Sequence, residues 1–418
     1  MAKTRRKKQG WEFELQKWLR PFVEALGNKR RERLAPLYVR GLILPGERKS
    51  IEPIAKRVAP SDLQQLHHFV STSPWATEPV QEVLVKQAQA LVGGGVLIID
   101  DTGLVKKGVK SVGVGHQYCG QLGKNTNSQA LVSLTMARDE VPVAVGLRLF
   151  LPKQWTDKPK RCAAAGVPKS IDFQTKGQIA LSEIDRVIKA GATFGVVCAD
   201  AGYGTSAAFR AGLDERGLRW AVGINFNQHV YAPATNLITT QPKQAGRKRK
   251  YPRVSQPSMS AKKFIEALGA KAFTDVSWRQ GTKGKLGCKF AAARVLVADG
   301  KEVADGTHLP GRSVWLVCER RASGEQKYYL TNHEPNTPLK TLARAIKSRW
   351  VCEQAHQQLK EELGLDHFEG RSWNGLHHHA LFSMMAFCFL QHLRLKEKKR
   401  LEHRGHHHSP LFPTSASE

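Results

Sequence analysis

Residues 96–102 form a short apolar run that ends in two adjacent acids: Val96-Leu97-Ile98-Ile99-Asp100-Asp101-Thr102. Consecutive aliphatic residues, most of them β-branched, are typical of a strand buried on both faces. A carboxylate beside such a strand costs free energy to desolvate unless the protein uses it. The stretch therefore predicts a central strand of an α/β sheet with a functional carboxylate at its end.

A second stretch repeats this pattern later in the chain. Residues 194–199 are again largely apolar, and Asp200 follows them directly. In α/β sheets, functional sites gather where neighbouring strands end. Either acid alone could be a turn residue or the N-cap of the next helix, but two such strand ends in one predicted sheet favour a shared site.

The third acid lies in a segment, residues 339–363, that we expect to be one long helix ending at Gly364. One stripe of this helix is apolar and should face the core: Cys352, Ala355, Leu359 and Leu363. The adjacent stripe is polar: Arg349, Glu353, His356 and Lys360. Glu353 should therefore lie at the edge of the buried face, and an exposed ladder of ion pairs is the alternative interpretation.

Three acids on separate elements suit metal-dependent phosphoryl transfer. Mg²⁺ prefers oxygen ligands and retains waters, so two or three carboxylates suffice to hold it. In two-metal sites the ions activate the attacking oxygen and stabilise the leaving oxygen. We therefore predict two Mg²⁺ ions, with Mn²⁺ tolerated, held by Asp100 or Asp101, by Asp200 and by Glu353.

The chain is strongly basic, with 65 Lys and Arg against 36 Asp and Glu and a formal charge of +29 over 418 residues. Such an excess opposes compaction through self-repulsion and indicates a polyanionic partner. Nucleic acid fits best, because phosphate contacts supply most of its non-specific affinity for proteins. A membrane surface and the ribosome are the alternatives.

The sequence shows none of the patterns of an exported or membrane protein. No apolar run approaches the roughly 20 residues that cross a bilayer. Residues 5–8 are basic, but no apolar region of the kind found in secretory signals follows them. The seven cysteines have no C-x-x-C spacing. We expect reduced, mostly buried thiols in a cytoplasmic, nucleoid-associated protein without a membrane partner.

Composition and periodicity divide the chain into five parts. Residues 1–92 look helical and are either a DNA-end-binding domain or a helical packing module. Residues 93–225 alternate strands and helices as in a mixed sheet with helices on its faces, broken by a basic loop at 153–169. Residues 226–332 indicate a mainly β insertion, 333–395 a helical end of the core, and 396–418 a disordered tail.

At its acids the sequence resembles the bacterial insertion-sequence DDE transposases, in particular the branch with a Tyr-x2-Arg-x3-Glu-x6-Lys signature. Arg349, Glu353 and Lys360 match that signature at the same spacing. The first acid lies in the family-like stretch Ile99-Asp100-Asp101-Thr102-Gly103, and the second in Ala199-Asp200-Ala201-Gly202-Tyr203-Gly204. The resemblance extends over residues 35–395.

The resemblance implies a ribonuclease-H-like catalytic domain with Asp100 or Asp101, Asp200 and Glu353 as catalytic acids. The 153-residue gap between the second and third acids fits a β insertion. It also implies an enzyme that nicks the ends of its own mobile element and joins the freed 3′-hydroxyl to target DNA, as a homodimer on double-stranded DNA. Ile346 occupies the position of the signature tyrosine, which leaves open whether a hairpin-forming pathway applies.

Basic side chains near the acids are expected to hold DNA phosphates. The signature implies Arg349 and Lys360, with His356 as a further contact. Lys106 and Lys107 lie near the first acid, where a solvated turn is the alternative.

A basic loop in the insertion should add salt-sensitive affinity: Arg247, Lys248, Arg249 and Lys250. Trp278 and Trp315 could stack on a distorted base, although core packing is the simpler explanation.

Three other functions stay open on the sequence alone. A different ribonuclease-H-fold nuclease, such as a junction resolvase, would cut DNA without joining strands. A catalytically inert DNA-binding protein descended from a transposase would behave the same with and without metal. A basic RNA-binding scaffold would require neither metal nor inverted-repeat DNA.

Overall fold

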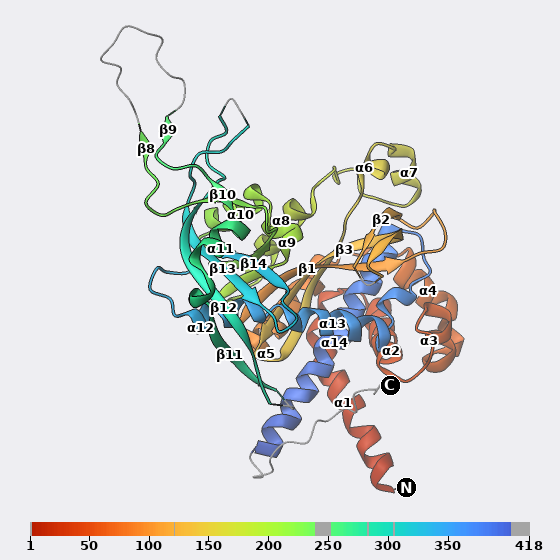
Figure 1. Ribbon diagram of the computed structural model, residues 1–418. Helices are drawn as coiled ribbons and strands as arrows, with labels where there is room; N and C mark the ends of the chain where they lie inside the picture. Colours follow the sequence, from red (N-terminus) through yellow and green to blue (C-terminus); the bar gives the residue numbers. More distant parts are fainter. Residues whose placement is uncertain (1, 121, 239–251, 282–283, 304–305, 403–418) are drawn as a thin grey trace. The chain divides into compact units, whose positions relative to one another are not determined.

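The computed structural model describes residues 2–120, 122–238, 252–281, 284–303 and 306–402 (Figure 1). It is a mixed α/β structure that divides into two compact units. The first comprises Met1–Gly95, Asp100–Phe194 and Val351–Glu418, and the second comprises Val96–Ile99 and Gly195–Trp350. Strand β1 (Val96–Val105) begins in the second unit and ends in the first.

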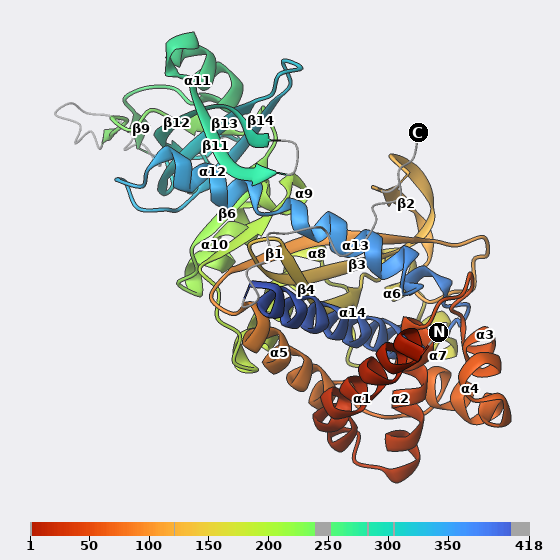
Figure 2. The same cartoon turned by 90° about the horizontal axis from the view of Figure 1, so that it is seen from below.

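Five helices open the first unit, as expected from the helical periodicity of residues 11–92. They are α1 (Ala2–Ala25), α2 (Lys29–Ile43), α3 (Ile51–Val58), α4 (Leu63–Ser71) and α5 (Glu78–Val92). Helix α14 (Trp373–Glu402) contacts α2, α4, α5 and strand β4, and Figure 2 shows it between β4 and these helices. The N-terminal helices therefore share a core with α14.

Helix α14 is longer than the sequence indicates. The composition predicts disorder from residue 396, but α14 continues to Glu402. Lys396 Nζ lies 2.9 Å from a carboxylate oxygen of Glu14 on α1, and the rings of Trp18 and Phe389 are 5.5 Å apart. These contacts with α1 favour the helical conformation at this end. The histidines at 406–408 lie outside the described residues.

Strands β2 (Gly115–Cys119), β3 (Lys124–Arg138) and β4 (Val141–Leu149) complete the sheet of the first unit. Strands β2 and β4 both pair antiparallel with β3. Residues 128–137 of β3 are all buried, which requires cover on both faces. Helix α8 (Lys176–Lys189) contacts β3 and β4, and α14 and α5 also contact β4.

Residues 153–169, expected as a loop, contain two short helices, α6 (Lys153–Thr156) and α7 (Pro159–Ala164). Trp155 holds them in place. Its side chain is buried, its Nε1 donates to the carbonyl of Val114 at 2.7 Å, and the Arg161 guanidinium carbon lies 3.7 Å from its ring centroid. One buried tryptophan thus orders a segment whose Lys and Pro content favours a loop.

In the second unit, the start of β1 pairs in parallel with β5 (Val196–Ala199), and β5 pairs in parallel with β6 (Trp220–Ile224). Helices α9 (Ala201–Gly204) and α10 (Ala207–Glu215) connect β5 to β6. The first of these helices begins directly after Asp200, so a short turn carries this acid from the strand end.

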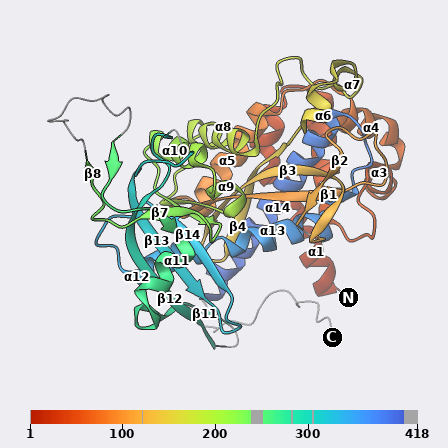
Figure 3. The ribbon, with the colours of Figure 1, turned by 45° about the horizontal axis from the view of Figure 1, so that its top comes forward.

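The mainly β insertion is present and extends the sheet in the order β6–β14–β13–β12–β7–β10, with β11 on β12. Figure 3 shows β11, β12, β13 and β14 of this insertion side by side. Its strands in this sheet are β7 (His229–Tyr231), β10 (Met259–Ser260), β11 (Thr274–Gly281), β12 (Gly284–Val297), β13 (Ser313–Arg320) and β14 (Gln326–Thr331). Strands β8 (Leu237–Ile238) and β9 (Arg253–Val254) form a separate pair, and α11 (Ala261–Leu268) follows β10.

The strands around β1 follow the order β4–β3–β1–β5–β6. Antiparallel hairpin strands thus lie on one side of β1, and parallel strands with helical connections lie on the other. This is the arrangement of a ribonuclease-H-like fold. The predicted fold class, a mixed sheet with flanking helices and a β insertion, is confirmed.

The prediction of a single helix over residues 339–363 is wrong. The segment forms two helices, α12 (Leu339–Lys347) and α13 (Trp350–Glu361). Ser348 ends the first helix, and its hydroxyl donates to the carbonyl of Ala345 at 2.6 Å. Arg349 therefore lies between two helices. Gly364 follows α13 with φ of 66°, the left-handed conformation expected of a C-terminal glycine.

Candidate active site

Asp100 lies where β1 enters the first unit, and its carboxylate is tied to helix α13. The thiol of Cys352 donates to Asp100 Oδ2 at 3.1 Å, and the backbone N–H of Asp101 donates to Asp100 Oδ1 at 2.8 Å. Both Asp100 oxygens are thus oriented by neighbours. Because Glu353 directly follows Cys352, the first and third predicted acids belong to elements that touch within one unit.

A second contact fixes the same helix. The Ser133 hydroxyl on β3 lies 2.8 Å from His356 Nε2 and donates to the Asp100 backbone carbonyl at 3.0 Å. Cys352 and His356 are four residues apart and therefore share a helix face. The predicted apolar stripe of α13 is buried, whereas Glu353 is exposed. Contacts on its buried face thus hold α13 in place, and Glu353 lies on its exposed side.

Asp101 has a different environment. Its Oδ2 pairs with the ammonium group of Lys176 on α8. Consecutive side chains of a strand point to opposite faces, so Asp100 faces α13 while Asp101 faces α8. The two acids that sequence reasoning leaves equivalent are therefore distinguished by their contacts.

Asp200 caps helix α9 in the second unit. Its Oδ1 accepts a hydrogen bond from the Tyr203 backbone N–H at 3.3 Å. Strand β6 passes so close to this turn that a Cβ at Gly223 would lie 2.8 Å from Ala201 N. A Cβ at Gly204 would lie 2.0 Å from the Gly223 carbonyl oxygen. Both glycines let the turn that carries Asp200 sit against β6.

Asp200 and Arg349 line the same pocket of the second unit, which has a volume of about 390 Å³. The end of α12 is held near β5, because the Cys198 thiol donates to the Ala345 carbonyl at 3.2 Å. Cys198 precedes Asp200 by two residues, and Ala345 precedes Arg349 by four. The pocket therefore combines a carboxylate with a guanidinium, a group whose geometry suits carboxylate and phosphate oxygens.

The other predicted cations differ in accessibility. Lys360 is 7% exposed and His356 is 8% exposed. Burial lowers the pKa of Lys360, and also that of Lys106, whose Nζ donates to the Phe368 carbonyl at 2.8 Å. Lys107 is exposed. Lys107 is thus the most accessible of these cations, Arg349 and Lys106 are half-buried, and Lys360 and His356 are buried.

Two tryptophans and a basic loop were singled out in the insertion, and the structure describes only the tryptophans. Trp278 and Trp315 are half-buried, with Lys347 Nζ 4.8 Å from the Trp278 ring and Arg294 5.5 Å from the Trp315 ring. Packing therefore explains both tryptophans. The basic loop Arg247, Lys248, Arg249 and Lys250 lies outside the described residues.

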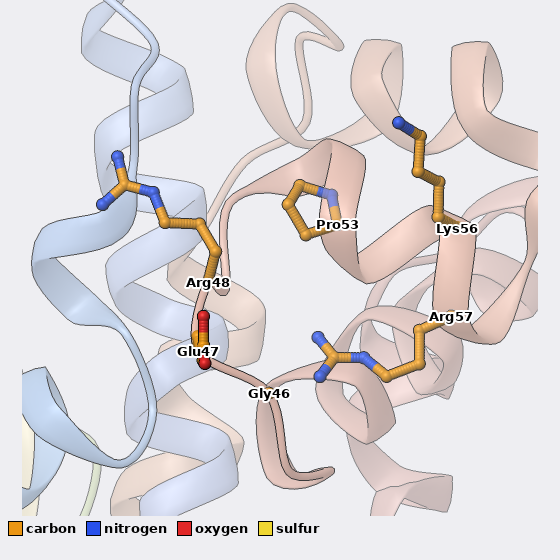
Figure 4. A pocket seen from close by; sticks show the side chains of 6 residues that line it. All are labelled: Gly46, Glu47, Arg48, Pro53, Lys56 and Arg57. Atoms are coloured by element: carbon orange, nitrogen blue, oxygen red, sulfur yellow. The ribbon is translucent and has the colours of Figure 1, made fainter.

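A basic pocket of about 500 Å³ lies among the N-terminal helices, lined by Gly46, Glu47, Arg48, Pro53, Lys56 and Arg57. In Figure 4, Arg57 points toward Gly46, whereas Arg48 and Lys56 point away from it. Arg48 pairs with Glu369 and Lys56 with Glu52, both at 2.7 Å. These cations do not converge on one point, so they form a basic surface rather than an anion site.

The three candidate acids are divided between the units, with Asp100 and Glu353 in the first and Asp200 in the second. No group of three or more His, Cys, Asp or Glu side chains is arranged to hold a metal ion within the described ranges. All seven cysteines are described, and none forms a disulfide. In the same described part of the chain, no helix has the length and apolar character needed to span a membrane.

A ribonuclease-H-like sheet with acids on β1 and directly after β5 defines a class of polynucleotide-processing α/β proteins. Residues 21–285 match the family described as DDE superfamily endonuclease. The match covers more than half of the chain, which therefore belongs to the DDE superfamily endonucleases. The matched residues include the first two acids but end before α12. The assignment of Glu353 as the third acid therefore depends on the signature and on the contacts of α13.

One relative is the probable transposase for insertion sequence element IS701 of Microchaete diplosiphon. It is 32% identical over 231 residues, which cover 54% of this chain and 57% of that protein. The chain thus matches little more than half the length of this relative. The solved piggyBac transposase synaptic complex with hairpin DNA is also similar, with a TM-score of 0.42 and 8% identity over 90% of this chain and 67% of that one.

Proposed function

We propose that this chain is a DDE transposase that cuts and joins DNA at the ends of a mobile element. Asp100, Asp200 and Glu353 are the catalytic acids. The observation that carries this proposal is the register of β1: Ile99 pairs with Ala199 in parallel. Asp100 follows Ile99 within β1, and Asp200 follows Ala199 at the end of β5, so each acid comes one residue after this paired position.

The third acid enters through α13. Cys352 donates to Asp100 Oδ2 within the first unit, and Glu353 is the next residue. This contact with α13 favours Asp100 over Asp101, which is paired with Lys176 on the opposite face of the strand.

The three proposed ligands fit Mg²⁺ or Mn²⁺, because all of them are carboxylates and these ions prefer oxygen ligands to thiolate or imidazole. When bound, such ions supply Lewis-acid activation of the attacking and leaving oxygens of a phosphodiester. Asp100, Asp200 and Glu353 would hold them. Ser133 and Cys352 orient Asp100, and Arg349 binds a phosphate beside Asp200.

The proposed substrate is double-stranded DNA, as element ends and as target, bound by a homodimer. The excess of 65 basic over 36 acidic residues supports a polyanionic partner. Arg349 and Lys107 are the proposed phosphate contacts near the acids. Lys360, His356 and Lys106 are buried or bonded to the protein, and we propose that they act mainly by holding α13 and its surroundings.

A product assay tests the proposal. Labelled duplexes carrying the repeats that flank the coding region would be incubated with the full chain, Mg²⁺ and a target plasmid. A transposase yields nicked ends and then labelled strands joined to the plasmid. Cleavage without joining would indicate another ribonuclease-H-fold nuclease, and binding without cleavage would indicate an inert DNA-binding protein.

A further inference from the structure

A buried carboxylate of the insertion has no part in the chemistry proposed above. Glu319 lies on β13 and is 1% exposed. Its Oε1 accepts hydrogen bonds from Lys347 Nζ at 2.7 Å and from Arg321 Nε at 3.2 Å, and its Oε2 accepts one from the Tyr329 hydroxyl at 3.0 Å. Burial by itself raises the pKa of Glu319, but these three partners hold it below its usual value. Glu319 is therefore a buried anion.

The first of these partners connects Glu319 to the end of helix α12. Lys347 is the last residue of α12, and only Ser348 separates it from Arg349. The Lys347 ammonium also lies 4.8 Å from the centroid of the Trp278 ring. Its bond to Glu319 therefore ties the point from which the Arg349 backbone continues to the sheet of the insertion.

The second partner, Tyr329, leads to the same arginine from the sheet. Glu319 pairs with Lys327 across β13 and β14, so Glu319 and Tyr329 are diagonal neighbours on one face. Tyr329 lines the pocket that holds Asp200 and Arg349. Burial and the Glu319 carboxylate raise the pKa of Tyr329, and the Arg349 guanidinium is close enough to oppose this shift. The hydroxyl thus lies between two electrostatic influences, a buried anion and the pocket cation.

Stability alone does not account for the buried anion. Replacing a buried ion pair by apolar side chains of similar volume is often neutral or stabilising. An arginine in a pocket, however, loses side-chain freedom when it binds a phosphate, and surroundings that already restrict it reduce this cost. Both Lys347 and Tyr329 restrict Arg349, one through the chain and one through the pocket wall, and Glu319 fixes both.

We propose that Glu319 is a positioning residue that acts through Lys347 and Tyr329 to hold Arg349 in the orientation that binds a DNA phosphate beside Asp200. This inference rests on the proposed function, because it takes Arg349 as a phosphate contact. Glu319 is buried and does not itself meet DNA. Its removal should therefore weaken DNA binding only while Arg349 is present.

Binding without metal tests this separately from cleavage. The probe is a duplex carrying the repeats that flank the coding region, titrated in EDTA at several salt concentrations. The proteins are the full wild-type chain, Tyr329→Phe, Glu319→Gln, Arg349→Ala, and each of the first two substitutions combined with Arg349→Ala. The control is Tyr231→Phe, which removes another buried tyrosine hydroxyl of the insertion, bonded to the His308 carbonyl at 2.6 Å.

We expect Arg349→Ala to weaken binding by about five-fold and to lower the slope of log affinity against log salt by about one. Tyr329→Phe and Glu319→Gln should each weaken binding by about three-fold or more when Arg349 is present. In the Arg349→Ala background both should change the affinity by less than about two-fold, because they act through the missing side chain. Tyr231→Phe should bind like the wild type.

A loss of the same size in both backgrounds would overturn the inference, because it would show a general effect on the fold. Unchanged binding in any of the three single variants would overturn it as well. Urea unfolding identifies a variant that has lost its fold, and Tyr329→Phe, which keeps the buried anion and two of its donors, then decides the result. A wild-type chain that binds this duplex but does not cleave it with Mg²⁺ would contradict the proposed function and leave this comparison intact.

Discussion

The thiol of Cys352 donates a hydrogen bond to Asp100 Oδ2 across 3.1 Å, although 252 positions separate the two residues in the chain. This bond brings the first predicted acid into contact with the helix that carries the third, Glu353. Within the first unit, the first and third predicted acids therefore lie on elements that are joined by a hydrogen bond.

The contacts of Asp100 and Asp101 predict opposite results for two isosteric substitutions. Asp100→Asn removes a carboxylate on the α13 side and should lower Mg²⁺-dependent cleavage by about 100-fold or more. Asp101→Asn removes the partner of Lys176 and should keep most of the activity, because this ion pair is partly solvent-exposed. Single-turnover cleavage of element-end DNA measures both. Loss of cleavage in Asp101→Asn with full activity in Asp100→Asn would reverse the assignment.

Ser133 should act as a positioning residue. Its hydroxyl links His356 to the Asp100 carbonyl, so Ser133→Ala should reduce the cleavage rate by about 2- to 10-fold, the value of one lost hydrogen bond. Ser133→Thr retains the hydroxyl and should restore most of the rate. DNA affinity without metal should stay unchanged in both variants. An equal defect in both variants would indicate a packing effect instead.

Gly223 should be required for the position of Asp200. In Gly223→Ala the new Cβ would lie 2.8 Å from Ala201 N, so the turn that carries Asp200 must shift. We expect a destabilisation of about 1–3 kcal/mol and a large loss of cleavage. Gly108→Ala is the control, because nothing lies within 4 Å of a Cβ there. Urea unfolding and cleavage rates that match the wild type in Gly223→Ala would contradict this account of the turn.

Three consecutive histidines of α14 predict a loss of stability in acid. Burial lowers the pKa of His377 to about 3 and those of His378 and His379 to about 4. The unfolded chain takes up these protons near pH 6.5, whereas the folded chain does so only near pH 4 or below. The free energy of unfolding therefore does not depend on these histidines above about pH 6.5. Below that pH it falls by up to about 1.4 kcal/mol per pH unit for each histidine.

Urea titrations between pH 7.5 and 5 measure this dependence. His379→Gln retains a polar group that can bond to Tyr38 and Gly364, but it cannot titrate in this range. Its stability should fall less steeply with pH than that of the wild type. A free energy of unfolding that does not change between pH 7 and 5 would show that these histidines are not held neutral.

The two aspartate positions were the most predictable part of the candidate site, but the strand end predicted at Asp100 was wrong, because β1 continues to Val105. The apolar runs before Asp100 and Asp200 carry the signal of buried strands, and both acids lie where that signal ends. The choice between Asp100 and Asp101 could not be made from sequence, because alternation places them on opposite faces without saying which face α13 covers. Ser133 is too distant in sequence from His356 for any local pattern to reveal their contact.

Tertiary contacts also explain the wrong predictions. The break at Ser348 contains neither Gly nor Pro, and apolar residues recur on both sides of it at Ile346 and Trp350, so periodicity alone predicts one helix. The segment around Trp155 is ordered by a hydrogen bond to Val114.

We propose that Glu353 acts with Asp100 and Asp200 in metal-dependent cleavage. Its most direct test is the Mg²⁺-dependent, single-turnover cleavage of element-end DNA by Glu353→Gln, with Glu361→Gln on the same helix as the control. We expect cleavage to fall by about 100-fold or more in Glu353→Gln, while DNA binding in EDTA and urea stability stay the same. Wild-type cleavage by a folded Glu353→Gln protein would contradict the account.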